Sequence, residues 1–115
     1  MPQYAAIIYS TDVDWTAPEH ADEMAEYGRF GQERADRITG GAALFPTSTA
    51  TVVRVQGGRG GDVVTADGPY ADTKEALTGF FLLEAADLDE AVRIASEIPA
   101  AWNGAVEVRP VIPMG

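Results

Sequence analysis

Two short segments of the chain are apolar at nearly every position. Tyr4–Tyr9 reads YAAIIY and Gly79–Ala85 reads GFFLLEA, so an extended strand there presents apolar side chains on both faces. A strand with one side in water instead alternates apolar and polar residues. We therefore expect both segments to be central strands of one sheet, and we expect both faces of that sheet to be covered.

Two helices are predicted, one after each of these strands. Thr16–Glu19 has the spacing of a capping box, and an apolar stripe continues from it to about Arg37. Gly40-Gly41 is expected to end this first helix, because glycine permits positive φ at a helix terminus. The second helix is expected to begin after Asp87, which is a suitable N-cap, and to end at Pro99.

A β-hairpin is predicted between the two helices. Thr49–Gln56 and Val63–Ala66 are rich in β-branched residues and flank the glycine-rich loop at 57–61. Ala43–Phe45 is either a short strand or an extended linker. Apolar and charged residues alternate near the C-terminus, which predicts a last strand over Val106–Ile112.

The predicted order of elements is β-α-β-β-β-α-β, in a single domain over residues 1–115. Without the extra hairpin strand this order is β-α-β-β-α-β, the ferredoxin-like split β-α-β arrangement of the α+β class. The two helices would cover one face of an antiparallel sheet. The same face of a second subunit is the expected cover for the other side, so we predict a homodimer.

Charge and cysteine content exclude several functional classes. The formal net charge of −10 repels phosphate backbones and anionic lipid, so neither nucleic acid nor a membrane surface is an expected partner. No cysteine and one histidine, His20, make a zinc site improbable, and no metal or cofactor is predicted. We expect His20 to be a solvated residue at a helix end. No basic segment precedes the first apolar run, so we expect no signal peptide and a cytoplasmic location.

The densest local motif is Asp67-Gly68-Pro69-Tyr70, in which Asp-Gly supports a tight turn and Pro69 fixes the next φ. Asp67 either accepts amide hydrogen bonds within that turn or is a carboxylate at a pocket mouth, able to act as a base or to fix a ligand. Tyr9, at the end of its strand, is a candidate to point its hydroxyl into the same cavity. Asp67 is the candidate catalytic residue, and the candidate ligand-binding residues are Tyr9, Asp67, Tyr70, Lys74 and Glu75.

The segment from Asp67 to Glu75, followed by Gly79–Leu83, closely resembles the central motif of the YCII-related family, in its DGPF-type form. The similarity continues through Asp87–Ala91 and Gly104–Pro110, so it spans nearly the whole chain. The resemblance implies a ferredoxin-like fold that pairs into a dimeric α+β barrel, with a cavity between sheet and helices. Some relatives were proposed to be enzymes from a histidine–aspartate pair in the cavity, and the helix histidine of that pair falls near Met24 here.

Two functional hypotheses follow. The first is a small-molecule-binding or regulatory protein; other DGPF-type members look associated with extracytoplasmic-function sigma factors, so the resemblance also implies a sigma factor as a partner. The second is a metal-independent enzyme in which Asp67 transfers a proton on a small organic substrate. An enzyme of that kind needs Asp67 in an enclosed pocket, within hydrogen-bond reach of a second titratable group.

Overall fold

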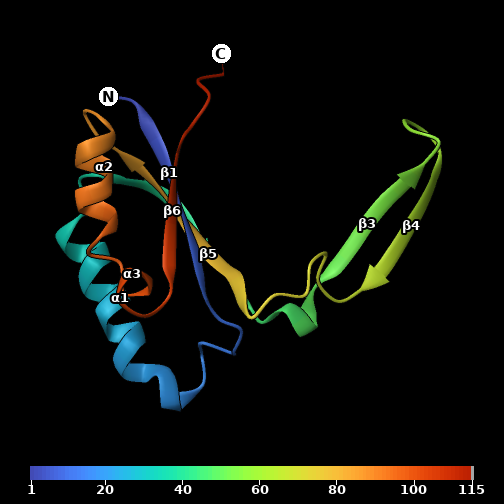
Figure 1. The fold of residues 1–115 in the computed structure, drawn as a ribbon, viewed down its shortest axis with the longest axis horizontal. Coiled ribbons are helices and arrows are strands. Elements are labelled where there is room, and N and C mark those ends of the chain that lie inside the picture. The colour runs from blue at the N-terminus through green and yellow to red at the C-terminus, as the bar shows by residue number, and fades with distance from the viewer. Residues whose placement is uncertain (115) are drawn as a thin grey trace.

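The computed structural model describes residues 1–114 and shows a four-stranded antiparallel sheet with helices on one face (Figure 1). In spatial order the strands are β2 (Ile38–Ala43), β5 (Glu75–Glu84), β1 (Gln3–Thr11) and β6 (Ala105–Pro110). The helices are α1 (Ala21–Glu33), α2 (Leu88–Ala95) and the short α3 (Ala100–Asn103). The predicted α+β class and the central position of the two apolar strands are confirmed.

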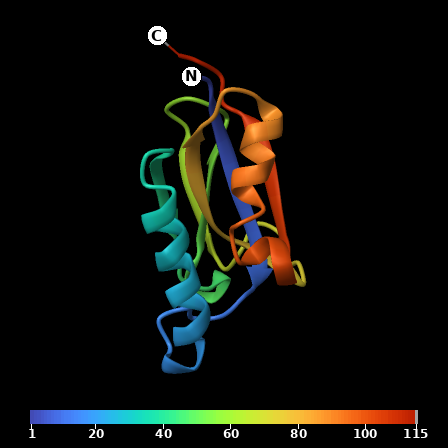
Figure 2. The ribbon, with the colours of Figure 1, turned by 90° about the vertical axis from the view of Figure 1, so that its left-hand side faces the viewer.

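The sheet is built from two interleaved β-α-β units. In β1-α1-β2 the two strands are separated by β5, and in β5-α2-β6 the two strands are separated by β1. This is a split β-α-β arrangement. All three helices lie in front of the sheet when it is viewed from the helical side (Figure 2). The opposite face of the sheet carries no helix within residues 1–114.

Residues of β1 alternate between the two faces of the sheet. Tyr4, Ala6, Ile8 and Ser10 are buried against the helices, and the residues between them are only half-buried. Leu83 of β5, which is fully buried, continues this core. Small residues such as Ala91 on the facing side of α2 let that helix pack closely against the sheet.

The predicted hairpin is present, but neither of its strands belongs to the main sheet. β3 (Thr51–Gln56) and β4 (Asp62–Asp67) pair only with each other in the described part of the chain. The hairpin projects from the body on the side away from the helices (Figure 1). The expectation that one of its strands completes the sheet is therefore wrong, because β2 occupies that edge position.

The first helix ends earlier than predicted, and the glycine pair that was expected to end it lies in β2. α1 stops at Glu33, and the chain turns through Arg34–Arg37 before β2 begins. A Cβ at Gly41 would stand 2.5 Å from the carbonyl oxygen of Phe80 on the neighbouring strand. Glycine is thus required here for close approach of two strands, which the sequence does not distinguish from a helix stop.

Both helix starts were predicted near their observed places, with one difference in capping. Asp87 caps α2 as expected, because its carboxylate accepts a hydrogen bond from the amide of Glu90 at 2.9 Å. α2 ends at Ala95, and Pro99 is the N-cap of α3 rather than the end of α2. Thr16 caps no helix; a 3₁₀ turn at Pro18–His20 precedes α1 instead. No helix in the described residues is long and apolar enough to cross a membrane.

Candidate functional site

The residues singled out from the sequence lie on open surfaces in this structure. Asp67 is the last residue of β4 and is exposed, and Tyr70 is 78% exposed. Lys74 and Glu75 are exposed just before and at the start of β5. Tyr9 lies on the helix-free face of the sheet, in register with Leu77 of β5. The structure of residues 1–114 thus does not gather these five side chains around one cavity.

The Asp67–Tyr70 turn forms the base of the hairpin. The amide of Gly68 donates a 2.8 Å hydrogen bond to the carbonyl oxygen of Ala50, which closes the hairpin where it leaves the body. Gly68 has a φ of +100°, a conformation that glycine adopts without strain. The Arg54 guanidinium lies 5.2 Å from the centre of the Tyr70 ring, in cation–π geometry.

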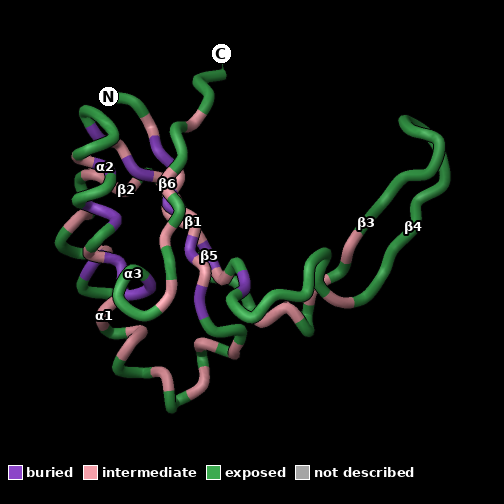
Figure 3. The backbone as a smooth tube through the Cα atoms, in the orientation of Figure 1, coloured by how far each residue is buried: buried purple, intermediate pink, exposed green. Residues whose placement is uncertain are grey.

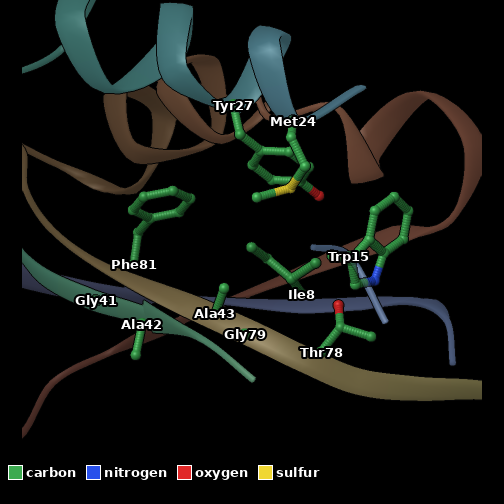
Figure 4. A pocket seen from close by; sticks show the side chains of 10 residues that line it. All are labelled: Ile8, Trp15, Met24, Tyr27, Gly41, Ala42, Ala43, Thr78, Gly79 and Phe81. Atoms are coloured by element: carbon green, nitrogen blue, oxygen red, sulfur yellow. The ribbon is translucent and has the colours of Figure 1, made fainter. Parts of the chain in front are cut away.

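A cavity of about 260 Å³ lies between α1 and the sheet (Figure 4). Ile8 of β1 points toward it, so the next residue, Tyr9, points to the opposite face. Met24 and Tyr27 reach down from α1, Ile8 and Phe81 rise from the sheet, and Trp15 closes one end. Each of these side chains is largely apolar. The cavity therefore offers an apolar environment that favours an apolar guest.

Small residues create the empty volume. Gly41 and Ala43 of β2 and Gly79 of β5 form one wall, to which Ala42 contributes no side chain because its Cβ points the other way. A Cβ at Gly79 would stand 2.7 Å from the carbonyl oxygen of Ala42, so this glycine serves the packing of the strands as well as the cavity. With no large side chain on this part of β2, α1 remains separated from the sheet edge.

Three polar groups are found among the lining side chains. The hydroxyl of Thr78 is hydrogen-bonded to that of Ser10 at 2.6 Å, so these two groups satisfy one another. Burial, reinforced by the nearby carboxylate of Glu23, raises the pKa of Tyr27 to about 12, so its phenol is neutral at physiological pH. The third group, Trp15 Nε1, is buried and has no hydrogen-bond partner in residues 1–114.

The loop that carries Trp15 is well anchored. Asp14 accepts hydrogen bonds from the amide and the hydroxyl of Thr16, at 2.9 and 2.6 Å, and these bonds lower the pKa of Asp14. The ring of His20 packs on Trp15, with centroids 4.9 Å apart and planes at 49°. His20 stands at a helix end as expected, but its side chain is 24% exposed and packs on Trp15, so it is only partly solvated. His20 supports the outer side of the tryptophan that closes the cavity.

The lining residues contain no carboxylate, imidazole or ammonium group. Met24, the position near which the family resemblance places a histidine, contributes a thioether instead. General acid–base chemistry needs a group that titrates near the working pH. The described lining therefore suits binding better than proton transfer. The described residues also contain no cluster of three metal-ligating side chains.

Sequence reasoning found part of this site. The apolar stripe that was expected along the first helix includes Met24 and Tyr27, and these two residues do face the sheet, although above a cavity. Trp15 was not identified, and its signal was an aromatic residue in an otherwise polar loop. The wall of small residues also had a signal, the run of glycine and alanine at 40–43 opposite Gly79.

Comparison with known proteins assigns the chain to a family. Residues 3–115 match the YCII-related domain. An uncharacterised protein of Rhizobium meliloti (strain 1021), R00369, is similar, with 33% identity over 115 residues that cover 94% of this chain and 90% of the relative. The similarity extends over the hairpin as well as the body. The finer assignment to the DGPF type stays a prediction.

Proposed function

Because this chain belongs to the YCII-related family and has an apolar cavity beneath α1, we propose that it binds a small, uncharged, mainly aromatic or apolar molecule in that cavity. A charged guest would lose part of its hydration without gaining a countercharge, since no ionised side chain lines the described cavity. The net charge of −10 further disfavours anions.

The observation that carries this proposal is the unpartnered indole nitrogen of Trp15. A buried donor without an acceptor costs about 1–3 kcal/mol. The second tryptophan shows the usual arrangement, because Trp102 Nε1 donates to the carbonyl oxygen of Ser96 at 3.0 Å. A guest with one acceptor atom at the Trp15 end of the cavity would remove the cost at Trp15. The preferred ligand is therefore apolar over most of its surface and carries a single hydrogen-bond acceptor.

The enzymatic alternative, proton transfer by Asp67, has less support. Asp67 is exposed at the base of the hairpin rather than enclosed with a second titratable group. We do not propose a reaction for this chain. An association with a sigma factor remains an expectation from the family resemblance.

Quinoline and naphthalene form a suitable pair of probes, because they share a shape and differ in one acceptor nitrogen. Trp102→Phe leaves the Trp15 indole N–H as the single indole signal in a proton–nitrogen NMR spectrum. We expect quinoline to move this signal downfield and naphthalene to move it little. In Trp15→Phe the affinity for quinoline should fall roughly 3–10-fold relative to that for naphthalene.

Two neighbouring alanines supply a matched control. The Cβ of Ala43 points into the cavity and that of Ala42 points away from it (Figure 4). Ala43→Leu should abolish binding of both probes, whereas Ala42→Leu should preserve it. Probe binding that survives Ala43→Leu, or a Trp15 signal that responds equally to the two probes, would show that the cavity is not the site.

A further inference from the structure

The hairpin formed by β3 and β4 makes little contact with the rest of the chain. Nearly every residue from Thr51 to Asp67 is exposed, and the hairpin is drawn in the exposed colour over almost its whole length (Figure 3). An isolated two-stranded hairpin is at best marginally stable in water. A stable hairpin in this position therefore needs another surface to cover it.

One face of the hairpin is apolar. Val53 pairs with Thr65 and Val55 pairs with Val63, so these four side chains project from the same face. The three valines are 60%, 46% and 67% exposed, in sequence order. The opposite face places Arg54 beside Val64. The hairpin thus has an apolar face with no cover in the described chain.

The sheet offers a second apolar surface on the same side of the molecule. Ile7 of β1 pairs with Phe80 of β5, and Ala5 pairs with Leu82, all on the face without helices. The hairpin stands on that side of the sheet, as the two perpendicular ribbon views agree (Figures 1 and 2). A second chain that packs against this face of the sheet would therefore also contact the hairpin.

The exposed area of the chain is too large for a compact monomer. The accessible surface is 7758 Å², against about 6,100 Å² for a compact protein of this mass, an excess of about 1,700 Å². The radius of gyration is 16.2 Å, against about 13 Å. Obligate homodimers bury about 1,000–2,500 Å² per chain, so the excess matches the area that a stable dimer needs.

Charge does not oppose contact between the hairpin and a second copy of the chain. The hairpin contains Arg54, Arg59, Asp62 and Asp67 and is neutral, so the net charge of −10 lies entirely on the rest of the chain. A neutral hairpin meets no net repulsion from the acidic body of another copy. Since each chain has one hairpin and one open sheet face, a two-fold pairing covers both kinds of surface at once.

We propose that residues 51–67 are a dimerisation arm, whose face of Val53, Val55 and Val63 packs against a second copy of this chain. In this dimer the arm adds its contacts to those that the helix-free faces of the two sheets make with each other. Its role is separate from ligand binding in the cavity, which lies on the helical side of the sheet.

The test is sedimentation velocity of the full chain across micromolar concentrations. Val53→Asp places a charge in the proposed interface, and Val64→Asp places the same charge on the opposite face of the same hairpin. We expect a wild-type dimer whose dissociation constant rises roughly 30-fold or more in Val53→Asp and changes little in Val64→Asp. Far-ultraviolet circular dichroism and probe binding should be retained in both variants, since the cavity is remote from the hairpin.

Replacing the hairpin keeps the proposal testable if Val53→Asp misfolds. The hydrogen bond between Gly68 and Ala50 shows that the two ends of the hairpin are adjacent, so Asn-Gly can replace residues 51–67. This variant should keep the body folded and lose most of the dimer. A monomeric wild-type protein, an equal effect of the two aspartate substitutions, or a dimer that survives removal of the hairpin would overturn the proposal.

Discussion

The same substitution at two glycines should change stability in opposite directions. Gly79 lies in β5, where an added Cβ would stand 2.7 Å from the carbonyl oxygen of Ala42 and 3.3 Å from the Cα of Ala43. Both neighbours are backbone atoms, so no side-chain rotation relieves the contact and β2 must move away. Overpacking of this kind costs about 1–3 kcal/mol. It exceeds the roughly 0.5–1 kcal/mol by which alanine is otherwise favoured over glycine in a strand.

Gly28 provides the matched control. It is exposed on α1, and an added Cβ would meet nothing within 4 Å. Alanine is favoured over glycine in a helix by about 0.8–1.0 kcal/mol. We therefore expect Gly79→Ala to lower the free energy of unfolding by about 1–2 kcal/mol and Gly28→Ala to raise it by about 1 kcal/mol.

Urea denaturation at one fixed protein concentration measures both effects, because a chain that self-associates has a concentration-dependent stability. With an m-value of roughly 1–2 kcal/mol per molar, the two midpoints should differ by at least about 1 M. The Gly79 variant should also bind the cavity probes more weakly, since the residue lines the cavity. A Gly79→Ala protein as stable as the wild type would refute the close approach of β2 and β5.

The shifted pKa values of two side chains, Glu97 and Tyr27, predict how the stability of the fold depends on pH. Arg34 Nε donates a 2.8 Å hydrogen bond to Glu97 Oε1, and this bond holds the pKa of Glu97 below its usual 4.5. The ionised Glu97 therefore stabilises the fold fully above pH 4.5, and this contribution is lost as the pH falls through the lowered pKa. Glu97→Gln should therefore reduce the drop in urea midpoint between pH 6 and pH 3. The pKa of Tyr27 is raised from 10.0 to about 12, so its stabilisation is complete below pH 10 and is lost as the pH rises toward 12. Tyr27→Phe should therefore reduce the fall in urea midpoint between pH 10 and pH 12.

Local sequence patterns were sufficient for much of the fold. The two segments that are apolar on both faces correctly predicted β1 and β5, and Asp87 correctly predicted the start of α2, because each of these signals lies within a few residues. β2 was missed because Gly40 and Gly41 carry no side chain that could show a two-residue period. Gly41 is needed because of the neighbouring strand, where the carbonyl oxygen of Phe80 leaves no room for a Cβ. Such a contact is between segments far apart in the sequence.

The cavity could not be predicted from the sequence for the same physical reason. Its volume is the space that small residues of β2 and β5 leave beneath side chains from α1. No single segment contains this space, and the periodicity that placed Met24 and Tyr27 on a buried face does not reveal a void beneath them. The missing partner of Trp15 Nε1 is likewise a property of the folded chain.

The Asp67-Gly68-Pro69-Tyr70 motif gains a structural interpretation from its position. It closes the hairpin through the Gly68–Ala50 hydrogen bond and places Tyr70 beneath Arg54, on the face of the hairpin opposite the three exposed valines. Gly68 adopts a positive φ, and the exposed Tyr70 ring lies against one side chain of the hairpin, the Arg54 guanidinium. If the hairpin is the arm of a dimer, the direction in which it leaves the body depends on this turn. The glycine and the aromatic residue of the motif then serve assembly, and their presence requires no ligand at Asp67.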